Sequence, residues 1–322
     1  MPNLNVAVIG SPDYAKNLGK RSTASDITFF DQKKGEATVT FVEPTMYPDR
    51  LAPLFYSASM ADIAVVVVDQ VTPTLGESIL MLDSVGVRRG YIVLRNFLTK
   101  DQLAPFLKGT LLEHYEFIED DPVKLREMLL AEAEEVGAEP DERTGSSGSV
   151  PIDHHFDVKG VGTIILGWVA EGFVRKHDDV RLLPGGKPVQ IRSIQKHDDD
   201  FDWAVKGDRV GIALKGATIE DLDRGMILTN NESIKTSSAL TGKAHIIKYW
   251  LNPLKPGMVV HVGHWMQFVP ARVDAANSEG DWRTPSLTLA LQKELVYIPG
   301  SRAVITHLEG GKLRVVGTVE LG

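Results

Sequence analysis

The chain has no cysteine and no apolar run long enough to cross a membrane. Zero cysteines among 322 residues exclude a disulfide framework, a thiolate metal site and a cysteine nucleophile, and they suit a reducing compartment. The longest apolar run, Ile63–Val68, is far too short to span a bilayer, and no basic leader precedes an apolar core at the start. We therefore expect a cytoplasmic protein with no membrane partner.

Basic residues are also scarce, but only in the first half. The chain has 35 Lys and Arg against 43 Asp and Glu, a net charge of −8. Residues 1–150 carry 14 basic and 23 acidic side chains, whereas the remainder has a net charge of +1 and eight of the nine histidines. The acidic total argues against a protein that coats nucleic acid through bulk charge. A local nucleic-acid contact in the second half stays open.

The first 140 residues alternate predicted strands with predicted helices. Apolar, β-branched runs predict strands at Asn5–Ile9, Ile27–Phe30, Ala37–Val42, Ile63–Asp69, Gly90–Leu94 and His114–Ile118. Helical periodicity predicts helices at Leu51–Met60, Gly76–Val85, Lys100–Phe106 and Pro122–Val136. Buried strands alternating with helices are typical of a doubly wound sheet. Asp31–Gly35 is expected to turn a hairpin between two of the strands.

The composition changes after this α/β region. Glu139–Ser149 is polar and rich in glycine and serine, which predicts a flexible linker. Short β-rich runs follow, separated by Gly, Pro and Asp turns, and Asn230–Ser238 forms a second polar break. This spacing is typical of antiparallel barrels. We predict an α/β domain at 1–140 and two β-barrel domains at 150–233 and 238–322.

The loop after the first predicted strand partly matches a phosphate-binding pattern. The pattern G-x-x-x-x-G-K-[ST] wraps phosphates with backbone N–H groups, aims a helix N-terminus at them, and adds a Lys and a Mg²⁺-binding hydroxyl. Gly10 and Lys16 keep the spacing, with Asp13 between them, but Ala15 replaces the second glycine and Asn17 the hydroxyl residue. The alternative is a strand–loop–helix turn in which glycine and lysine occur by chance.

Longer segments carry a family resemblance. They are VEPTM, SASMADIAVVVVD, TPTLGESILMLDSVGV and YIVLRN in the first half, and VPIDHHFDVKGVGTIILGWVAEGFVRKHDDVRLLP, GDRVGIALKG and IEDLDRGMIL in the second. The chain resembles the translation elongation factor Tu and elongation factor 1-alpha family. IRSIQ and GDR make it most similar to SelB-like members, closest to the archaeal paralogues called EF-Pyl. The resemblance implies an α/β P-loop GTPase-like domain followed by two all-β barrel domains.

The residues with which this family hydrolyses and reads GTP are missing. The positions of its D-x-P-G-H motif hold Val42, Pro44, Thr45 and Met46, and those of N-K-x-D hold Asn96, Phe97, Leu98 and Thr99. The segment between Asn17 and Thr28, which corresponds to the first switch loop of the family, is short. Thr28 either matches the family threonine that meets Mg²⁺ or is simply the first residue of a strand. The resemblance implies GTP or GDP with Mg²⁺ as cofactor. The losses predict little or no GTPase activity, since phosphoryl transfer depends on positioning and electrostatics, and we assign no catalytic residue.

The resemblance assigns RNA binding to the second domain. In the family this barrel receives the 3′ end and aminoacyl group of a charged tRNA. The positions that match the pocket are Asp153, His154, Phe156, Gln195, His197 and Arg209. Flat side chains can stack on unpaired bases, while amides and cations reach base edges, the 2′-OH, carbonyls or phosphates. The implied partners are tRNA, aminoacylated or free, and the ribosome.

Several alternatives remain at this stage. No metal site is expected, because His154 and His155 would face opposite ways along a strand and Asp198–Asp200 lacks EF-hand spacing. Phe156 could equally be a barrel-core residue. The chain could instead be an active guanine-nucleotide switch with a non-standard loop, or a scaffold that binds other proteins. We predict a SelB-like factor that binds tRNA through its barrels and has a degenerate GTP site.

Overall fold

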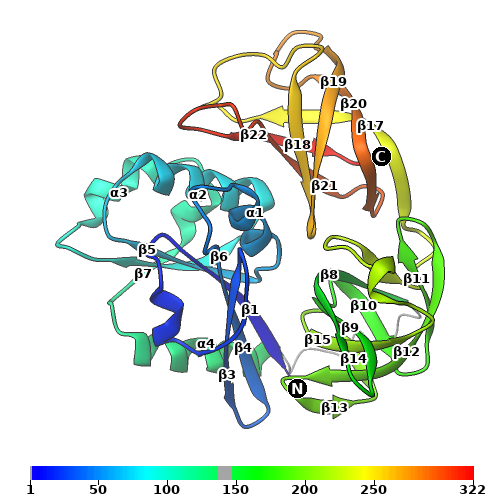
Figure 1. Cartoon of the computed structure of the whole chain (residues 1–322). Helices are drawn as coiled ribbons and strands as arrows, with labels where there is room; N and C mark the ends of the chain where they lie inside the picture. Colours follow the sequence, from blue (N-terminus) through cyan, green and yellow to red (C-terminus); the bar gives the residue numbers. More distant parts are fainter. Residues whose placement is uncertain (1, 137–146) are drawn as a thin grey trace. The chain divides into compact units, whose positions relative to one another are not determined.

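The computed structural model of the chain describes residues 2–136 and 147–322 (Figure 1). The described residues fall into two compact units. The first contains the residues up to 136 together with 307–316, and the second contains 147–306 together with 317–322. The predicted linker lies outside the described residues as far as 146. Its last residues, Gly148 and Ser149, instead belong to strand β8.

The first unit is built around a seven-stranded sheet in the order β2-β3-β4-β1-β5-β6-β7. The strands are β1 (Asn3–Ile9), β2 (Lys20–Ala24), β3 (Thr28–Lys34), β4 (Ala37–Glu43), β5 (Ile63–Val68), β6 (Arg89–Leu94) and β7 (Glu116–Ile118). Strands β4, β1, β5, β6 and β7 run parallel, while β2 and β3 add an antiparallel edge. Strand β5 is buried along its whole length and is a continuous apolar run, whereas β1, which is equally buried, also contains Asn3 and Asn5.

Four α-helices pack on this sheet at the places that the periodicity predicts. They are α1 (Ala52–Ser59), α2 (Pro73–Val85), α3 (Lys100–Leu107) and α4 (Pro122–Val136). Figure 1 shows α4 on one face of the sheet and α1, α2 and α3 on the other. Helix α2 begins where the Thr72 hydroxyl accepts the Leu75 N–H, and it ends at Gly86 in the left-handed conformation. Leu125, Leu129 and Ala133 of α4 are buried in the core.

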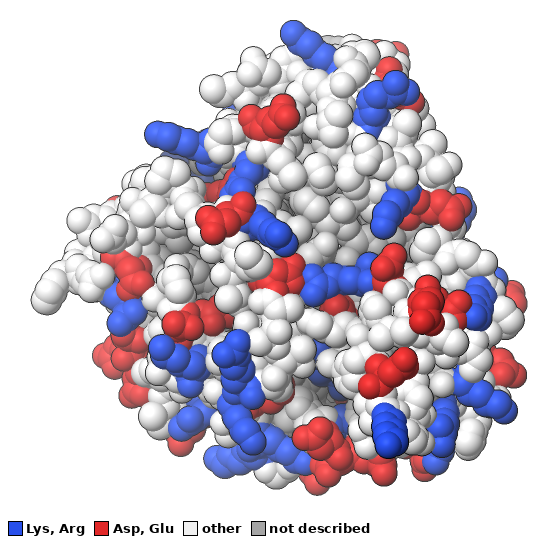
Figure 2. Space-filling model, viewed as in Figure 1, with Lys and Arg blue, Asp and Glu red and all other residues white. Residues whose placement is uncertain are grey.

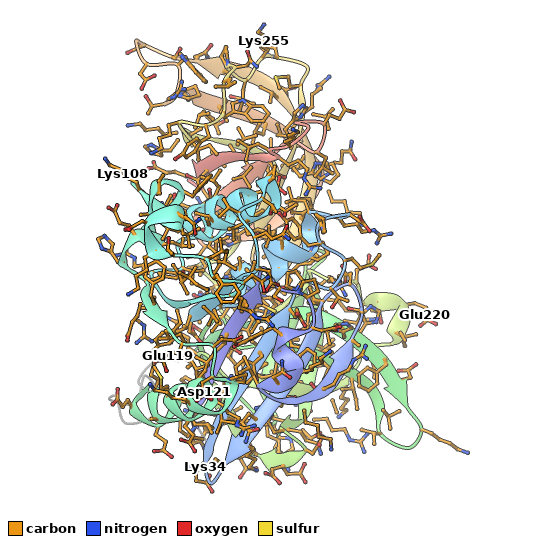
Figure 3. All side chains as sticks on the ribbon, turned by 90° about the vertical axis from the view of Figure 1, so that its left-hand side faces the viewer. Lys34, Lys108, Glu119, Asp121, Glu220 and Lys255 are labelled. Carbon is orange, nitrogen blue, oxygen red and sulfur yellow. The ribbon has the colours of Figure 1, made fainter. Side chains whose placement is uncertain are left out.

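The structure differs in detail from the sequence analysis at three places in this unit. The loop after β1 leads into a single 3-10 turn, η1 (Tyr14–Asn17), and then into β2, instead of an α-helix. Leu18 is the one large apolar residue between Tyr14 and Ile27, so a helix there would have no apolar face to bury. The predicted hairpin between β3 and β4 forms, but its turn consists only of Gly35 and Glu36, because β3 continues to Lys34, labelled in Figure 3. His114 ends a 3-10 turn, η2 (Leu111–His114), before β7.

The rest of the chain forms two β-barrels. The first consists of β8 (Gly148–Val158), β9 (Gly162–Trp168), β10 (Glu171–Arg175), β11 (Asp179–Leu183), β12 (Lys187–Lys196), β13 (Asp199–Phe201), β14 (Trp203–Val205), β15 (Arg209–Lys215) and β16 (Ile227–Thr229). Pairing of β8 with β9 closes its sheet. The second is a closed barrel of β17 (Lys235–Ile246), β18 (Val259–His264), β19 (Gln267–Asn277), β20 (Ser286–Tyr297), β21 (Arg302–Thr306) and β22 (Val315–Glu320).

The predicted fold class is confirmed. A parallel α/β sheet with helices on both faces precedes two all-β barrels, in the order that the sequence indicates. Among the described residues, no helix combines the length and the apolar character needed to cross a membrane.

Candidate functional sites

The loop after β1 turns sharply at Gly10. The φ angle there is +109°, and a Cβ atom would lie 2.1 Å from the carbonyl oxygen of Val67, so only glycine fits. Asp13 is also left-handed, with φ 63°, and η1 follows it. Lys16 extends from η1 with its Nζ 3.7 Å from Asp13 Oδ2, and both side chains are mostly exposed. The loop therefore keeps the predicted turn but lacks the α-helix of the phosphate-binding pattern.

The loop lines a cavity of about 410 Å³. Its walls are Ser11, Pro12, Asp13, Tyr14, Lys16, Asn17, Arg95, Asp120 and Pro122. The structure thus brings together Asp13, Lys16 and Asn17 of the predicted nucleotide residues. Gly10 and Thr28 lie outside this lining.

Arg95, at the end of β6, connects three loops at the carboxyl edge of the sheet. Its Nη1 donates to Ser11 Oγ at 3.3 Å and lies 3.1 Å from Asp69 Oδ1. Its Nε lies 3.0 Å from Asp120 Oδ2, and Tyr14 donates its hydroxyl to the other oxygen of Asp120 at 2.8 Å. Asp120 lies between two further acids, Glu119 and Asp121, which Figure 3 labels. This edge is therefore rich in carboxylates.

Glu43, the last residue of β4, is a site residue that the sequence analysis missed. It is 7% exposed and lies beside the backbone N–H groups of Asp13 and Tyr14. Burial, and then the charge of Asp13, raise the pKa of Glu43 to about 7, although the two N–H groups and Lys16 act in the opposite direction. The sequence feature that could have identified it is an acidic residue directly after the predicted strand Ala37–Val42 and before Pro44.

The two segments that match the switch regions contact each other directly. Thr28 is the first residue of β3 and lies opposite Glu43 in the β3–β4 register. It is buried, and its hydroxyl oxygen is 2.6 Å from that of Thr45. The Met46 N–H donates to the backbone oxygen of Asp26 at 3.1 Å. Of the two alternatives for Thr28, a Mg²⁺ ligand or the first residue of a strand, the structure shows the second. The Thr28 hydroxyl pairs with that of Thr45 within the protein.

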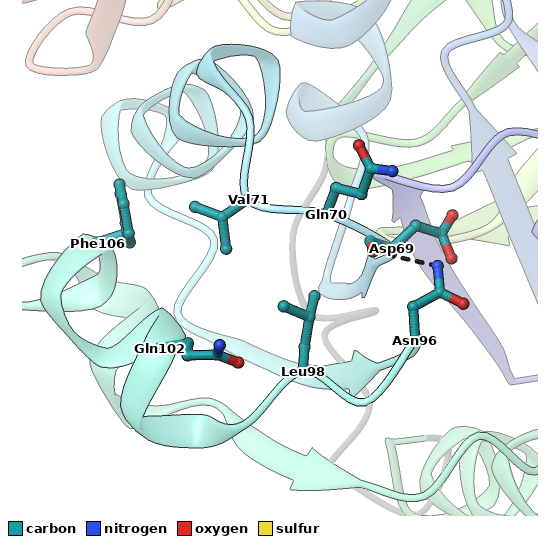
Figure 4. Close-up of a pocket in the computed structure, with 7 residues that line it drawn as sticks. All are labelled: Asp69, Gln70, Val71, Asn96, Leu98, Gln102 and Phe106. Carbon is teal, nitrogen blue, oxygen red and sulfur yellow. Dashed lines mark hydrogen bonds between the residues drawn. The ribbon is translucent and has the colours of Figure 1, made fainter.

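The strand end that matches the guanine-reading motif lines a separate cavity of about 580 Å³ (Figure 4). The lining residues are Asp69, Gln70, Val71, Asn96, Leu98, Gln102 and Phe106. Asn96 donates its side-chain N–H to the backbone oxygen of Asp69 at 3.2 Å, the dashed line in Figure 4. Thr99, where the family has an aspartate, forms a capping box with Gln102 at the start of α3. This position therefore starts a helix and presents no carboxylate to a base.

In the first barrel the structure brings Asp153, His154 and Arg209 into direct contact. Both terminal nitrogens of Arg209 donate to the buried Asp153 carboxylate, Nη2 to Oδ1 at 2.9 Å, and His154 Nδ1 lies 2.5 Å from Oδ1. Arg224, another residue that the sequence analysis missed, donates from Nε to the Asp153 backbone oxygen. Burial acts to raise the pKa of Asp153, but the Arg209 charge and the hydrogen bonds from His154 and Arg209 outweigh it, and the pKa lies below its ordinary value. Arg209, the cation predicted to meet a carbonyl or phosphate, is therefore paired with a carboxylate of the protein.

His154 and Gln195 lie in one register row across β8, β9, β15 and β12. His154 is opposite Leu166, Leu166 is opposite Gly211, and Gly211 is opposite Gln195. Directly opposed residues of antiparallel strands point to the same face, and three strand spacings correspond to roughly 14 Å. Of the two middle residues of this row, Gly211 has no side chain, and the side chain of Leu166 lies beside it. We call the outer face that carries the row the platform.

Phe156 also belongs to the platform, because it lies two residues after His154 on β8. It is 40% exposed, which rules out the alternative of a barrel-core residue. Gln195 is exposed and donates its amide N–H to Asp200 Oδ1 at 2.9 Å. His197 is half-buried in the turn between β12 and β13, with φ 48°. The structure therefore places five of the six predicted RNA residues on strands β8, β12 and β15 of one barrel, and His197 in the turn after β12.

Comparisons with known proteins agree with this architecture. Residues 162–229 match the family model of elongation factor Tu domain 2. An uncharacterized protein of Methanocaldococcus jannaschii is 36% identical over 323 residues, with 100% of both chains covered. The selenocysteine-specific elongation factor of the same organism is 39% identical over 125 residues, which make up 38% of this chain and 27% of that factor.

Solved structures have the same fold over nearly the whole chain. Translation elongation factor SelB from Methanococcus maripaludis, in complex with the GTP analogue GppNHp, superposes with a TM-score of 0.82 at 24% identity. The match covers 99% of this chain and 79% of that one. The apo form of the same factor gives a TM-score of 0.80. From the order of its domains, its second-domain sequence and these relatives, the chain belongs to the SelB-like family of translation elongation factors.

Proposed function

We propose that this protein is a SelB-like elongation factor paralogue that binds tRNA through its barrels and does not cycle on GTP. The observation that carries the proposal is the platform of the first barrel. His154, Phe156 and Gln195 share this face, next to the buried Asp153–Arg209 pair. The narrower resemblance to EF-Pyl, and a ribosomal partner, remain predictions.

The platform has the groups that bind an unpaired RNA end. Phe156 exposes a ring on which a base can stack, and His154 offers a second flat group beside it. Gln195 carries an amide that can exchange its Asp200 contact for a base edge or a 2′-OH. The Asp153 carboxylate holds the Arg209 guanidinium in one orientation.

The loop after β1 does not fit a Mg²⁺-bound nucleotide. The buried side chain of Glu43 lies beside the loop N–H groups that would meet a phosphate, and the turn that follows has only four residues. The groups that would meet Mg²⁺ are an amide at Asn17 and the Thr28 hydroxyl, which is bonded to Thr45. The protein therefore lacks a basis for switching by nucleotide hydrolysis.

The test is binding of unfractionated tRNA, deacylated and aminoacylated, by fluorescence anisotropy at low salt. Phe156→Ala should weaken binding by about tenfold, the free energy of one stacked base. The matched control is Phe106→Ala, which removes an equally large phenylalanine that is 46% exposed on α3. An equal affinity for wild type and both variants would contradict the platform as the RNA site. Absence of tRNA binding would favour the scaffold alternative instead.

A second candidate is a guanine-nucleotide switch with an altered site. The cavity of about 410 Å³ beside Lys16 and Asn17 favours it, because a cation and an amide line that cavity. Titration with a fluorescent GTP analogue separates the two candidates. Mg²⁺-dependent binding with a micromolar Kd would support the switch. Absence of binding at millimolar concentrations of the analogue would support a tRNA-binding factor that does not cycle on GTP.

A further inference from the structure

Lys196, the last residue of β12, is a buried lysine within the barrel that carries the platform. It is 2% exposed, and its Nζ lies 2.5 Å from Oδ2 of Asp208, which is equally buried. The same nitrogen lies 4.7 Å from the ring centroid of Phe201 and 4.6 Å from that of Trp203. Removing two charges from water costs several kcal/mol per ion, so a buried pair adds little net stability. Its presence in this barrel therefore points to another role.

The residues on either side of Lys196 are the predicted RNA residues Gln195 and His197. Because side chains alternate along a strand, Lys196 points into the barrel while Gln195 points outward to the platform. Lys196 lies opposite Asp199 in the β12–β13 register, so His197 and Asp198 form a two-residue hairpin turn. Their φ angles are 48° and 70°, as a type I′ turn requires. Neither residue is glycine, so the turn carries backbone strain.

Asp208 connects this hairpin to the strand that carries Arg209. Its Oδ2 accepts the Val205 N–H at 2.9 Å, and its own N–H donates to the Val205 oxygen at 3.0 Å, so the turn between β14 and β15 holds the carboxylate in place. Arg209 follows directly, and its guanidinium pairs with Asp153 on β8. The pair of Lys196 with Asp208 and the pair of Arg209 with Asp153 thus link the three strands that carry predicted RNA residues.

We propose that Lys196 is a positioning residue of the platform. Its ammonium, held by Asp208, fixes the β12–β13 hairpin so that Gln195 faces the platform and His197 keeps its left-handed turn. A slip of one residue would turn Gln195 inward and leave the lysine without its partner. The pair thus specifies one register of the hairpin and adds little net stability. The inference rests on the proposed function, because the side chains that Lys196 positions are those proposed to bind RNA.

The test removes both charges at once. Lys196→Met combined with Asp208→Asn leaves neither partner's charge unpaired and keeps the net charge, so the double variant should have a Tm within a few degrees of wild type. It should bind unfractionated tRNA about fivefold more weakly, the effect of one lost hydrogen bond. Lys196→Gln combined with Asp208→Asn replaces the ion pair by two amides and is used, with the same expectation, if the first double variant fails to fold.

Coupling to Gln195 separates positioning from a general loss of structure. Gln195→Ala should weaken tRNA binding in wild type but not further in the double variant, because the amide is already displaced there. The matched control is Phe156→Ala on β8, which should weaken binding by about tenfold in both backgrounds. An equal effect of Gln195→Ala in both backgrounds would overturn the inference, as would unchanged tRNA binding by the double variant.

Salt dependence distinguishes positioning from direct contact with RNA. The slope of log Kd against log salt concentration should be the same for wild type and the double variant, because a buried ammonium neutralises no phosphate. A slope that is smaller in the double variant by roughly 0.7–0.9, the value of one phosphate contact, would show that Lys196 itself reaches the RNA and would refute the positioning role.

Hydrogen exchange without RNA separates this inference from the proposed function. Amides of residues 197–201 should exchange at least tenfold faster in the double variant, whereas residues 184–187, in the hairpin at the other end of β12, should not change. This pattern, combined with no tRNA binding by wild type, would support the hairpin role of Lys196 and refute the tRNA factor. Binding of tRNA by wild type, combined with equal exchange in both proteins, would support the tRNA factor and overturn the role of Lys196.

Discussion

At the scale of single residues, the ionisation of Glu43 links folding to pH. Its pKa of about 7 in the folded protein exceeds its ordinary value of 4.5, and the charged groups that act on it are Asp13 and Lys16. Between these two values the folded chain keeps a proton that the unfolded chain releases. The stability that Glu43 contributes is therefore fully present below pH 4.5 and is lost as the pH rises through 7.

Glu43→Gln tests this pH dependence. The amide cannot ionise, so the variant should lose less free energy of unfolding than wild type between pH 5 and pH 8. The difference should reach up to ~3 kcal/mol at pH 8, which corresponds to the size of the pKa shift. Urea unfolding at the two pH values measures it. Parallel pH profiles for wild type and variant would show that Glu43 titrates like an ordinary glutamate.

The Asp153–Arg209 pair gives a second prediction at this scale. Arg209→Ala would leave a fully buried carboxylate without its cation, which should lower the free energy of unfolding by about 3–5 kcal/mol. Arg209→Lys keeps the positive charge but loses the paired guanidinium donors, so it should lower the free energy of unfolding by less. The control is Arg192→Ala on the exposed side of β12, with an expected change below about 0.5 kcal/mol. Urea unfolding that shows equal stabilities for Arg209→Ala and Arg192→Ala would contradict the pairing.

Sequence reasoning predicted the identity of several site residues but not their partners. The family resemblance pointed to Asp153 and Arg209. It could not show that they pair, because the contact depends on a register shift between Ile152 and His154 in β8. Glu43 was missed because its place beside the loop depends on the register of β4 against β1 and on a left-handed Asp13, and neither of these has a signal in the sequence.

At the scale of elements, buried strands and amphipathic helices were predictable and an exposed edge strand was not. Strand β5 is a continuous apolar run, and each of the four α-helices lies within a few residues of its predicted range. Strand β2, with the sequence KRSTA, is exposed or half-exposed along its length and carries no alternating apolar pattern. Charged residues on an edge strand protect it from pairing with other chains. They also remove the alternating hydrophobic pattern by which a strand is predicted.

RNA binding to the platform can be blocked by adding a side chain instead of removing one. Gly211 lies in the middle of the row, and a Cβ atom there would meet only Leu166 Cδ2, at 3.4 Å. Gly211→Val should therefore fold with a change in free energy of unfolding below about 1 kcal/mol. It should weaken tRNA binding by at least tenfold, because the new side chain stands between His154 and Gln195.

The control for this variant is Ala239→Val, a comparable enlargement at an exposed strand position of the other barrel. Anisotropy with unfractionated tRNA and urea unfolding measure both properties. Undiminished tRNA binding by a folded Gly211→Val protein would contradict an RNA site that spans the row.

At the scale of the whole molecule, the charge distribution limits how RNA can bind. The net charge is −8, and Figure 2 shows basic and acidic side chains interspersed over the face that it displays. Binding through a broad basic surface would need one sign of charge to dominate. A local contact on the near-neutral half, made largely by stacking and hydrogen bonds, is consistent with both observations.

The order of the domains was predictable, while contacts between distant parts of the sequence were not. Glu77 on α2 is buried and pairs with Arg314, whose Nη2 lies 2.6 Å from Glu77 Oε2. These residues belong to the same compact unit, although most of the chain separates them in sequence. Neither residue lies in a recognisable motif, so only the three-dimensional arrangement identifies the pair.

The most direct test of nucleotide-independent tRNA binding is the Kd of wild-type protein for tRNA under three conditions. These are no nucleotide, GDP with Mg²⁺, and GppNHp with Mg²⁺, each with the same aminoacylated tRNA pool and salt concentration. A factor that does not cycle on GTP should give the same Kd in all three. A change of tenfold or more between GDP and GppNHp, about 1.4 kcal/mol of coupling free energy, would contradict the account.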